Sequence, residues 1–221
     1  MINEENYKRI MNDLSKKDTQ LIAVSKRKPV EDIMGLYELG HRDFGENRVQ
    51  ELTQKAPLLP DDIRWHFIGH LQSNKVKYIV PFVYMIHSVD KPKLLKEINK
   101  QSIKVNRKIK CLIQYHIAAE ENKFGFTHDE VLSLIRSEDF PKNTNVEIHG
   151  LMAMATNTLD KDKVRSEFKN LHSYFIDIKD NYIKSEHFNV VSMGMSGDYE
   201  LAIEEGSNMV RLGSVIFGKR D

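Results

Sequence analysis

Short apolar runs alternate with helix-like segments along this chain, and this alternation is its strongest constraint on fold. Eight runs resemble buried strands, at residues 21–26, 43–47, 65–70, 85–89, 110–117, 147–153, 188–193 and 209–217. Strands separated by helices are typical of parallel βαβ units. A closed (β/α)8 barrel fits the number of runs and the length of 221 residues, and a doubly wound open sheet fits the alternation as well.

Helix signals lie between the strand-like runs. Pro29 followed by Glu31 and Asp32 predicts a helix start, because the acidic side chains lie at the positive end of the helix dipole. An amphipathic helix is predicted over residues 160–184, and an opening helix near residues 3–14 precedes the first strand. We find no linker, repeat or low-complexity tract, so we expect residues 1–221 to form a single domain.

A lysine stands at the end of the first apolar run. The sequence Leu21-Ile22-Ala23-Val24-Ser25-Lys26 delivers Lys26 to the carboxyl end of the predicted strand, ahead of Pro29. A partly desolvated lysine near other cations can lose its proton and attack a carbonyl, forming a Schiff base. Taken alone, this pattern is more typical of a solvated lysine at a strand end.

The seventh run ends in a turn rich in glycine and serine. It reads Val190-Val191-Ser192-Met193-Gly194-Met195-Ser196-Gly197, and a helix is predicted from about Asp198. Such a turn leaves backbone N–H groups free to bind a phosphate, and Ser196 adds a hydroxyl donor. An ordinary strand-to-helix connection has the same composition.

The eighth run carries an arginine between apolar neighbours. Arg211 lies between Val210 and Leu212, and Gly213 and Ser214 follow. A buried guanidinium needs a partner, which is either a structural carboxylate or a ligand. Gly213 permits close backbone approach, and Ser214 supplies another hydroxyl.

An amine, two phosphate-binding turns and an inward arginine together match one small molecule, pyridoxal 5'-phosphate (PLP). This site also favours the barrel over the open sheet. In a closed barrel the first and eighth strands are adjacent, and barrels commonly bind phosphate at their last loops.

Five separated motifs resemble those of the PLP homeostasis proteins, which are single-domain relatives of the alanine racemase N-terminal barrel. The resemblance covers residues from about 3 to the end and rests on Ala23-Val24-Ser25-Lys26 with Pro29, Asp43-Phe44-Gly45-Glu46-Asn47, Trp65-His66-Phe67-Ile68-Gly69 with Leu71-Gln72-Ser73-Asn74-Lys75, Ser192-Met193-Gly194-Met195-Ser196 with Asp198, and Val210-Arg211-Leu212-Gly213 with Ile216-Phe217-Gly218.

The resemblance implies how this chain holds PLP. It implies a Schiff base on Lys26 and phosphate binding at Ser196 and at the turn of Gly213 and Ser214. It implies Arg211 against the pyridine nitrogen. The remaining implied neighbours of the ring or Schiff base are Asn47, His66 and Ser192.

The arginine has a chemical consequence for any bound PLP. Arginine is always charged and only donates hydrogen bonds, so its neighbour nitrogen must stay unprotonated and is a weaker electron sink. The chain ends at Asp221, just past the last predicted strand, and no racemase-type second domain is expected. We therefore expect a protein that holds and exchanges PLP, rather than an enzyme. The alternative is a PLP-dependent enzyme with weak racemase or transaminase activity, using Tyr115, Tyr199 or His66 as its second acid or base.

Composition limits the partners. A net charge of +1 and a pI near 7.8 disfavour a strong nucleic-acid or anionic-membrane surface. The polar N-terminus is no secretory signal, and no apolar stretch approaches membrane-spanning length. The lone Cys111 is expected to be a buried strand residue, which fits a cytoplasmic protein. We expect a monomer whose partners are PLP and PLP-dependent apo-enzymes.

Several histidines and loop residues leave alternatives open. A zinc site would use histidines near strand ends, but no His-x-His or His-Glu-x-x-His pattern is present, so we expect no catalytic metal. The sequence departs from the family at His70, at Gln114-Tyr115-His116 and at Met154. Lys75, on the loop after the third strand, would contact the cofactor region, a transferred ligand or a partner protein. Lys123, on the loop after the fifth strand, belongs either to the rim or to a charged surface loop.

Overall fold

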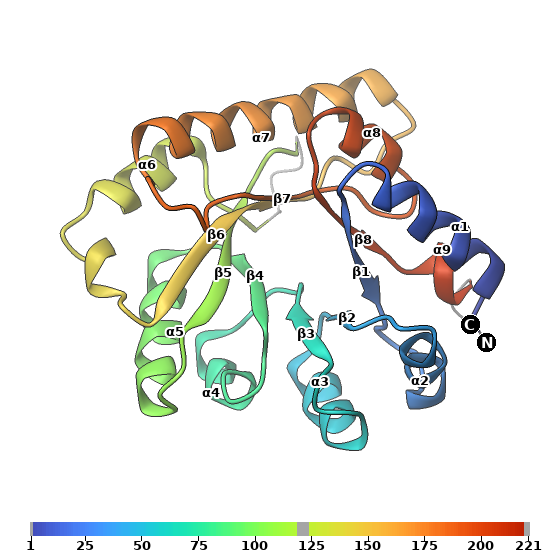
Figure 1. Ribbon diagram of the computed structural model, residues 1–221. Helices are drawn as coiled ribbons and strands as arrows, with labels where there is room; N and C mark the ends of the chain where they lie inside the picture. Colours follow the sequence, from blue (N-terminus) through green and yellow to red (C-terminus); the bar gives the residue numbers. More distant parts are fainter. Residues whose placement is uncertain (1, 119–123, 219–221) are drawn as a thin grey trace.

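Eight strands form one closed, all-parallel barrel. The computed structural model describes residues 2–118 and 124–218, and its strands pair in the order β1 to β8, with β8 hydrogen-bonded back to β1 (Figure 1). The strands are β1 Gln20–Val24, β2 Asp43–Glu46, β3 Arg64–Phe67, β4 Met85–Val89, β5 Ile109–Tyr115, β6 Val146–Ala153, β7 Val190–Ser192 and β8 Met209–Leu212. The predicted (β/α)8 barrel is confirmed, and the open doubly wound sheet is excluded.

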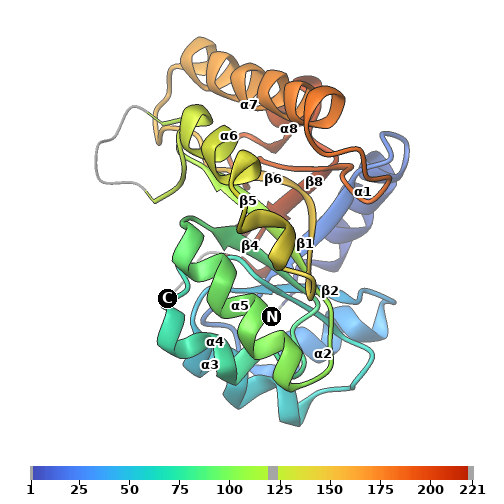
Figure 2. The same ribbon diagram turned by 90° about the vertical axis from the view of Figure 1, so that its left-hand side faces the viewer.

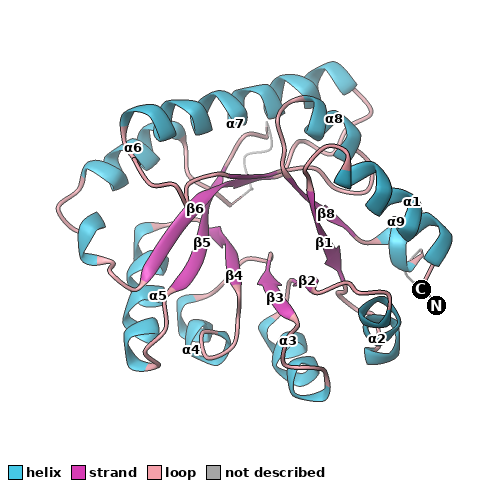
Figure 3. Ribbon diagram, viewed as in Figure 1, coloured by secondary structure: helices cyan, strands magenta, loops and turns pink. Residues whose placement is uncertain are grey.

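Helices surround the barrel, as Figures 2 and 3 show. In the described ranges they are α1 Glu4–Ser15, α2 Val30–Glu38, α3 Val49–Lys55, α4 Val76–Ile79, α5 Pro92–Lys104, α6 His128–Arg136, α7 Lys161–Asn181, α8 Tyr199–Glu204 and α9 Ser214–Phe217, with short 3-10 turns at Ala56–Leu58, Ser73–Lys75 and Phe140–Lys142. The predicted opening helix is therefore present as α1, and the long amphipathic helix as α7.

Local sequence explains where several helices begin. Pro29 is the N-cap of α2, and acidic residues follow it, as predicted. Thr127 and Glu130 form a capping box at α6, each side chain bonding the other residue's backbone N–H. Asp160 accepts hydrogen bonds from two backbone N–H groups at the start of α7.

The apolar core has two parts. A small cluster fills the barrel interior and comprises Ile22, Met85, Leu112, Met152 and Met209. A larger cluster lies between the strands and the surrounding helices, and it includes Cys111, which is fully buried as predicted. Alternation of side chains along each strand produces this division, since neighbouring residues face opposite sides of the sheet.

The last strand is shorter than predicted. We predicted a strand over residues 209–217, whereas β8 ends at Leu212 and a short helix, α9, follows. The backbone N–H groups of Ile216 and Phe217 both donate to the carbonyl of Gly213, which begins the helix. The prediction was wrong because Ile216 and Phe217 are buried as well, and periodicity does not separate a buried strand from a short buried helix.

Helix α1 closes the end of α9, and the two lie side by side in Figure 1. The backbone carbonyl of Val215 accepts from the Asn6 side chain, and that of Ile216 accepts from the backbone N–H of Asn3 at 2.8 Å. The carbonyl of Phe217 accepts from Lys28 Nζ at 2.8 Å. The extra N-terminal helix thereby satisfies carbonyls that so short a helix leaves open.

Within the described residues, none of the helices combines the length and the apolar character needed to cross a lipid bilayer.

Candidate functional site

The predicted site residues gather around the carboxyl ends of three adjacent strands. Lys26 follows β1, Ser196 follows β7, and Gly213 and Ser214 follow β8. Because β7 pairs with β8 and β8 with β1, these three loops are neighbours at one mouth of the barrel. Asn47 lies one strand further on, directly after β2.

Lys26 lies in a tight turn. The backbone N–H of Ser25 donates to the carbonyl of Gly45 at 3.0 Å, and that of Lys28 donates to the carbonyl of Ser25 at 3.0 Å. Arg27 has a φ of 63°, which is unusual for a residue with a side chain and marks local strain. Lys26 itself is half-buried.

A buried ionic cluster is hydrogen-bonded to the residues of this turn. Lys55 Nζ, at the end of α3, donates to the Ser25 carbonyl at 2.9 Å, to Glu46 at 2.8 Å and to Glu51 at 2.6 Å. Ser25 Oγ donates to Glu46 at 2.7 Å, and the backbone N–H of Arg27 donates to Glu51. The residues on both sides of Lys26 are therefore bound to one cluster.

Glu46 is the most desolvated member of the cluster. Its side chain is 0% exposed, and Oε2 has no hydrogen-bond partner in the described structure. Burial raises the pKa of Glu46, and the ion pair with Lys55 opposes that effect.

The two predicted phosphate turns meet each other. Ser196 Oγ accepts a hydrogen bond from the backbone N–H of Gly213 at 3.2 Å. A side chain at Gly213 would lie 3.3 Å from the carbonyl oxygen of Val24, so this glycine lets the turn pack against the end of β1. Among the described residues, no protein group accepts from the backbone N–H of Ser196, Gly197 or Ser214. These N–H groups suit a phosphate.

Arg211 is buried without a carboxylate partner. Nη1 donates to the Ser192 carbonyl at 2.8 Å and to Ser192 Oγ at 2.6 Å, and Nη2 donates to the Ala153 carbonyl at 2.9 Å. The residue is 4% exposed, and burial lowers its pKa to about 10 against a smaller raising effect of Asp198. No ion pair to Arg211 forms within the described ranges, which removes the structural explanation weighed from sequence.

His66 and Asn47 occupy different levels of the barrel. The His66 ring is fully buried inside it, contacting Asp43 and His87. Asn47 is half-buried at the mouth, where a side chain on Gly69 would lie 2.2 Å from the Asn47 carbonyl oxygen. The absence of a side chain at Gly69 therefore allows the loop after β3 to cross the Asn47 backbone.

The rim residues that the sequence left open lie beside Asn47. His70 and Lys75 line a cavity of about 360 Å³ with Asn47, Arg48, Val49, Gln50 and Gln72. His70 Nδ1 pairs with Asp90 at 2.8 Å, and its ring stacks on Phe124 with centroids 3.8 Å apart. Lys123 lies outside the described residues.

In the described ranges no group of three His, Cys, Asp or Glu side chains is placed so that it could hold a metal ion. His149 stacks on His187, and the backbone N–H of His116 donates to the Phe126 carbonyl. Met154 packs against the interior apolar cluster.

The sequence analysis did not identify the buried charged residues that contact the turn of Lys26 and the barrel interior. Lys55 and Glu51 sit on a helix whose pattern reads as an ordinary charged surface. Asp43 and Glu46 lie in the short strand β2, whose sequence resembles a family motif. The one available signal was two acidic residues within a fully buried strand, since buried carboxylates require partners.

Asp43 predicts acid sensitivity. Hydrogen bonds from Arg64 and His66 hold its pKa well below the usual range despite burial. A depressed folded-state pKa stabilises the protein above the unfolded-state pKa, near 4, and that stability is lost as pH falls. Urea unfolding between pH 5 and pH 3 should show the wild type losing about 1 kcal/mol more than Asp43→Asn. Equal losses in the two proteins would contradict this role of Asp43.

Comparison with known proteins gives consistent results. The family model described as alanine racemase, N-terminal domain, matches residues 3–221. A "Pyridoxal phosphate homeostasis protein" of Vibrio alginolyticus is 39% identical over 207 residues, covering 91% of this chain and 87% of that protein.

Two solved structures of PipY from Synechococcus elongatus PCC7942 share the fold. The structure without PLP has a TM-score of 0.90 at 32% identity and covers 97% of this chain and 99% of its own. The structure with PLP bound has a TM-score of 0.81 at 32% identity, with coverages of 91% and 93%.

The closed parallel barrel and the family-model match over residues 3–221 place this chain in the alanine racemase N-terminal class of barrels. Within that class, this chain belongs to the pyridoxal phosphate homeostasis protein family.

Proposed function

We propose that this chain binds PLP at the barrel mouth, holds it as a Schiff base on Lys26, and buffers or delivers it in vitamin B6 homeostasis. Amino-acid balance would be affected through the PLP supply. The name of the Vibrio alginolyticus relative and the PLP-bound PipY structure support this proposal.

The buried Arg211 is the observation that carries the proposal. A guanidinium has five N–H donors, and three of them are used by Ser192 and Ala153. The Nε hydrogen and one Nη2 hydrogen have no protein acceptor among the described residues. The free Nε is not among the buried side-chain atoms that lack a hydrogen-bond partner in the described structure, so it stays accessible to a ligand with an acceptor atom. The pyridine nitrogen of PLP is such an acceptor.

The remaining residues have distinct roles in this proposal. Ser196, Ser214 and the backbone of Gly213 would hold the phosphate, while Asn47, Ser192 and His66 would line or support the ring side of the site. When bound, PLP supplies an aldehyde that reacts with amines. The protein's contribution is to keep the Lys26 amine at the mouth and to anchor the phosphate.

Two candidates for a second acid or base, Tyr115 and Tyr199, are engaged elsewhere, and the third, His66, is held by hydrogen bonds to Asp43 and His87, which favours a carrier over an enzyme. Tyr115 contacts His128 of α6 and stacks on Tyr174 of α7, on the outer side of the barrel. The Tyr199 hydroxyl donates to Glu200, and His66 lies in the barrel interior. We include in the proposal that residues 1–221 act as a single-domain monomer whose recipients are PLP-dependent apo-enzymes.

The test is an absorbance spectrum of the purified protein with PLP, before and after borohydride, followed by peptide mapping. We expect a visible band that disappears on reduction, with the cofactor fixed to the peptide containing Lys26. A protein that stays colourless with added PLP would contradict the proposal. Amino-acid turnover assays then separate carrier from enzyme, since a carrier shows no sustained turnover.

A further inference from the structure

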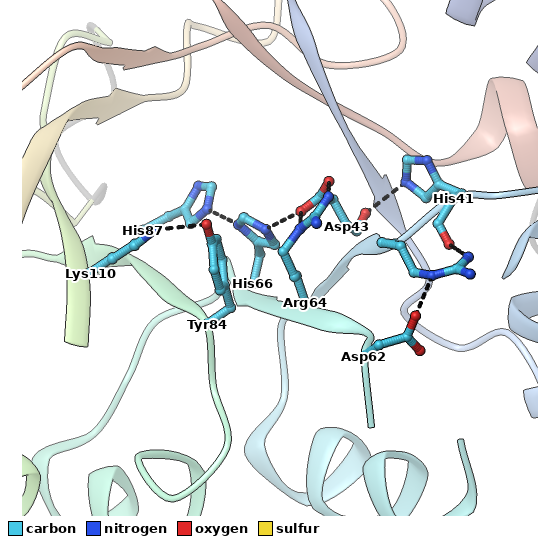
Figure 4. A network of polar contacts seen from close by, with 9 residues as sticks. His41, Asp43, Asp62, Arg64, His66, Tyr84, His87 and Lys110 are labelled. Carbon is cyan, nitrogen blue, oxygen red and sulfur yellow. Dashed lines mark hydrogen bonds and ion pairs between the residues drawn. The ribbon is translucent and has the colours of Figure 1, made fainter. Parts of the chain in front are cut away.

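A chain of hydrogen-bonded side chains crosses the barrel interior and ends at Arg211. It runs through Arg64, Asp43, His66, His87, Ser192 and Arg211, and Figure 4 shows the part from Arg64 to His87. Five strands contribute: β2, β3, β4, β7 and β8. Arg64 is 44% exposed at the amino end of β3, while His66, His87 and Ser192 are fully buried.

The contacts along the chain are continuous. Arg64 binds the Asp43 carboxylate through Nε at 2.7 Å and Nη2 at 2.5 Å. His66 Nε2 lies 3.1 Å from Asp43 Oδ1, and His66 Nδ1 lies 2.9 Å from His87 Nε2.

The second half of the chain leads from His87 to the arginine. His87 Nδ1 lies 3.4 Å from Ser192 Oγ, which is 2.6 Å from Arg211 Nη1.

Asp43 determines the direction of these hydrogen bonds when both imidazoles are neutral. A carboxylate only accepts, so His66 donates from Nε2 to Asp43, and His66 Nδ1 is then an acceptor for the Nε2 hydrogen of His87. His87 Nδ1 is left as an acceptor for the Ser192 hydroxyl, whose oxygen also accepts from Arg211, since arginine only donates. Each ring then carries its one hydrogen on Nε2.

Burial and neighbouring charge agree with neutral histidines. Burial is the largest effect on His66 and His87 and lowers both pKa values. His66 faces Asp43, Arg64, His87, Tyr84 and Lys110, and His87 faces His66, Ser192 and Arg211. The additional positive charges disfavour a second proton on either ring.

We propose that His87 is a positioning residue for Arg211: by accepting the Ser192 hydrogen it fixes Ser192 Oγ as the acceptor that aims the remaining Arg211 N–H groups at a bound ligand. This inference rests on the proposed function, in which that ligand is PLP. Asp43, the negatively charged member of this series, and Arg211, at its far end, are linked without an ion pair between them. Removing a central member releases the Ser192 hydroxyl to rotate and so loosens one of the three hydrogen bonds that orient Arg211.

The test compares three variants with the wild type, with PLP as the probe. His87→Leu interrupts the series of hydrogen bonds between His66 and Ser192, and His87→Gln retains one donor and one acceptor. His128→Phe removes a partly buried histidine outside the barrel. We expect His87→Leu to weaken PLP binding by at least about tenfold and to shift the visible band, His87→Gln to recover much of both, and His128→Phe to change neither.

Thermal unfolding separates positioning from stability. If His87→Leu lowers the melting temperature but keeps the wild-type affinity and spectrum, the inference is overturned while the proposed function stands. A wild type that does not bind PLP overturns the proposed function first.

Nitrogen-15 NMR of the wild-type histidines tests the inference without any variant. We expect His66 and His87 to carry their hydrogen on Nε2 between pH 6 and 8. A His87 hydrogen on Nδ1 would overturn the inference, whether or not the variants fold.

Discussion

Replacing Lys26 by alanine is expected to abolish covalent retention of PLP while leaving weaker, non-covalent binding. Under the proposed function Lys26 supplies the only bond to the aldehyde, so borohydride should fix no cofactor to Lys26→Ala. The turns at Ser196 and Gly213 and the Arg211 donors do not depend on the amine. The measurements are intact mass after borohydride reduction and the PLP dissociation constant.

Lys28→Ala is the matched control for that variant. Lys28 lies in the same turn, but its amine donates to the Phe217 carbonyl. We expect this control to keep a full borohydride adduct on the Lys26 peptide. An equally strong adduct in Lys26→Ala would move the Schiff base to another lysine and contradict the assignment.

Replacing Lys55 by methionine is expected to destabilise the protein by about 3 kcal/mol, the range seen when a buried ion pair loses one partner. The change removes three hydrogen bonds and leaves the fully buried Glu46 without its cation. The Ser25 carbonyl loses its donor as well, so the turn of Lys26 should loosen and PLP retention should fall. Urea unfolding and PLP release rates measure the two effects.

The pH dependence of the Lys55→Met variant follows from Glu46. Its pKa is already raised by burial, and loss of Lys55 raises it further. A raised folded-state pKa of an acid stabilises the folded protein only below the unfolded-state pKa, and that contribution is lost as pH rises. The variant's deficit should therefore be larger at pH 7 than at pH 5.

Two controls complete this experiment. Lys96→Met removes a lysine from an exposed ion pair with Asp139 and should change stability little. The double variant Lys55→Met/Glu46→Gln removes both buried charges and should recover part of the loss. If the double variant is no more stable than Lys55→Met, the buried charge on Glu46 is not the cause.

The barrel fold, and the end of the barrel at which the site lies, could be predicted from the sequence because both depend on local patterns. Each strand-like run is short, apolar and followed by a helix signal, and only parallel βαβ units satisfy that order. Lys26 and Asn47 end predicted strands and Ser196 follows one, so a closed barrel requires them to meet at one mouth. Gly213 lay inside the predicted eighth strand and reaches the mouth because β8 ends at Leu212. The end of β8 was misjudged because Ile216 and Phe217 are as apolar in a helix as in a strand.

The polar interior could not be predicted because its partners are distant in sequence. His66 and His87 are 21 residues apart, and Ser192 and His87 are 105 apart, yet each pair is in hydrogen-bond contact. No local pattern distinguishes Lys55, whose amine is buried, from the other lysines of surface helices.

The sequence by itself determined the eightfold alternation, the position of Lys26 at a strand end, and an arginine that needed a partner. Only the tertiary structure shows that the protein partners of Arg211 among the described residues are neutral oxygen atoms and not a carboxylate. Closure of the barrel places the Ser192 carbonyl, the Ser192 hydroxyl and the Ala153 carbonyl around its guanidinium. It also decided which carboxylates and amines are buried together beneath Lys26. The physical reason is that periodicity sets which face a side chain occupies, whereas hydrogen bonding in the interior depends on which faces meet.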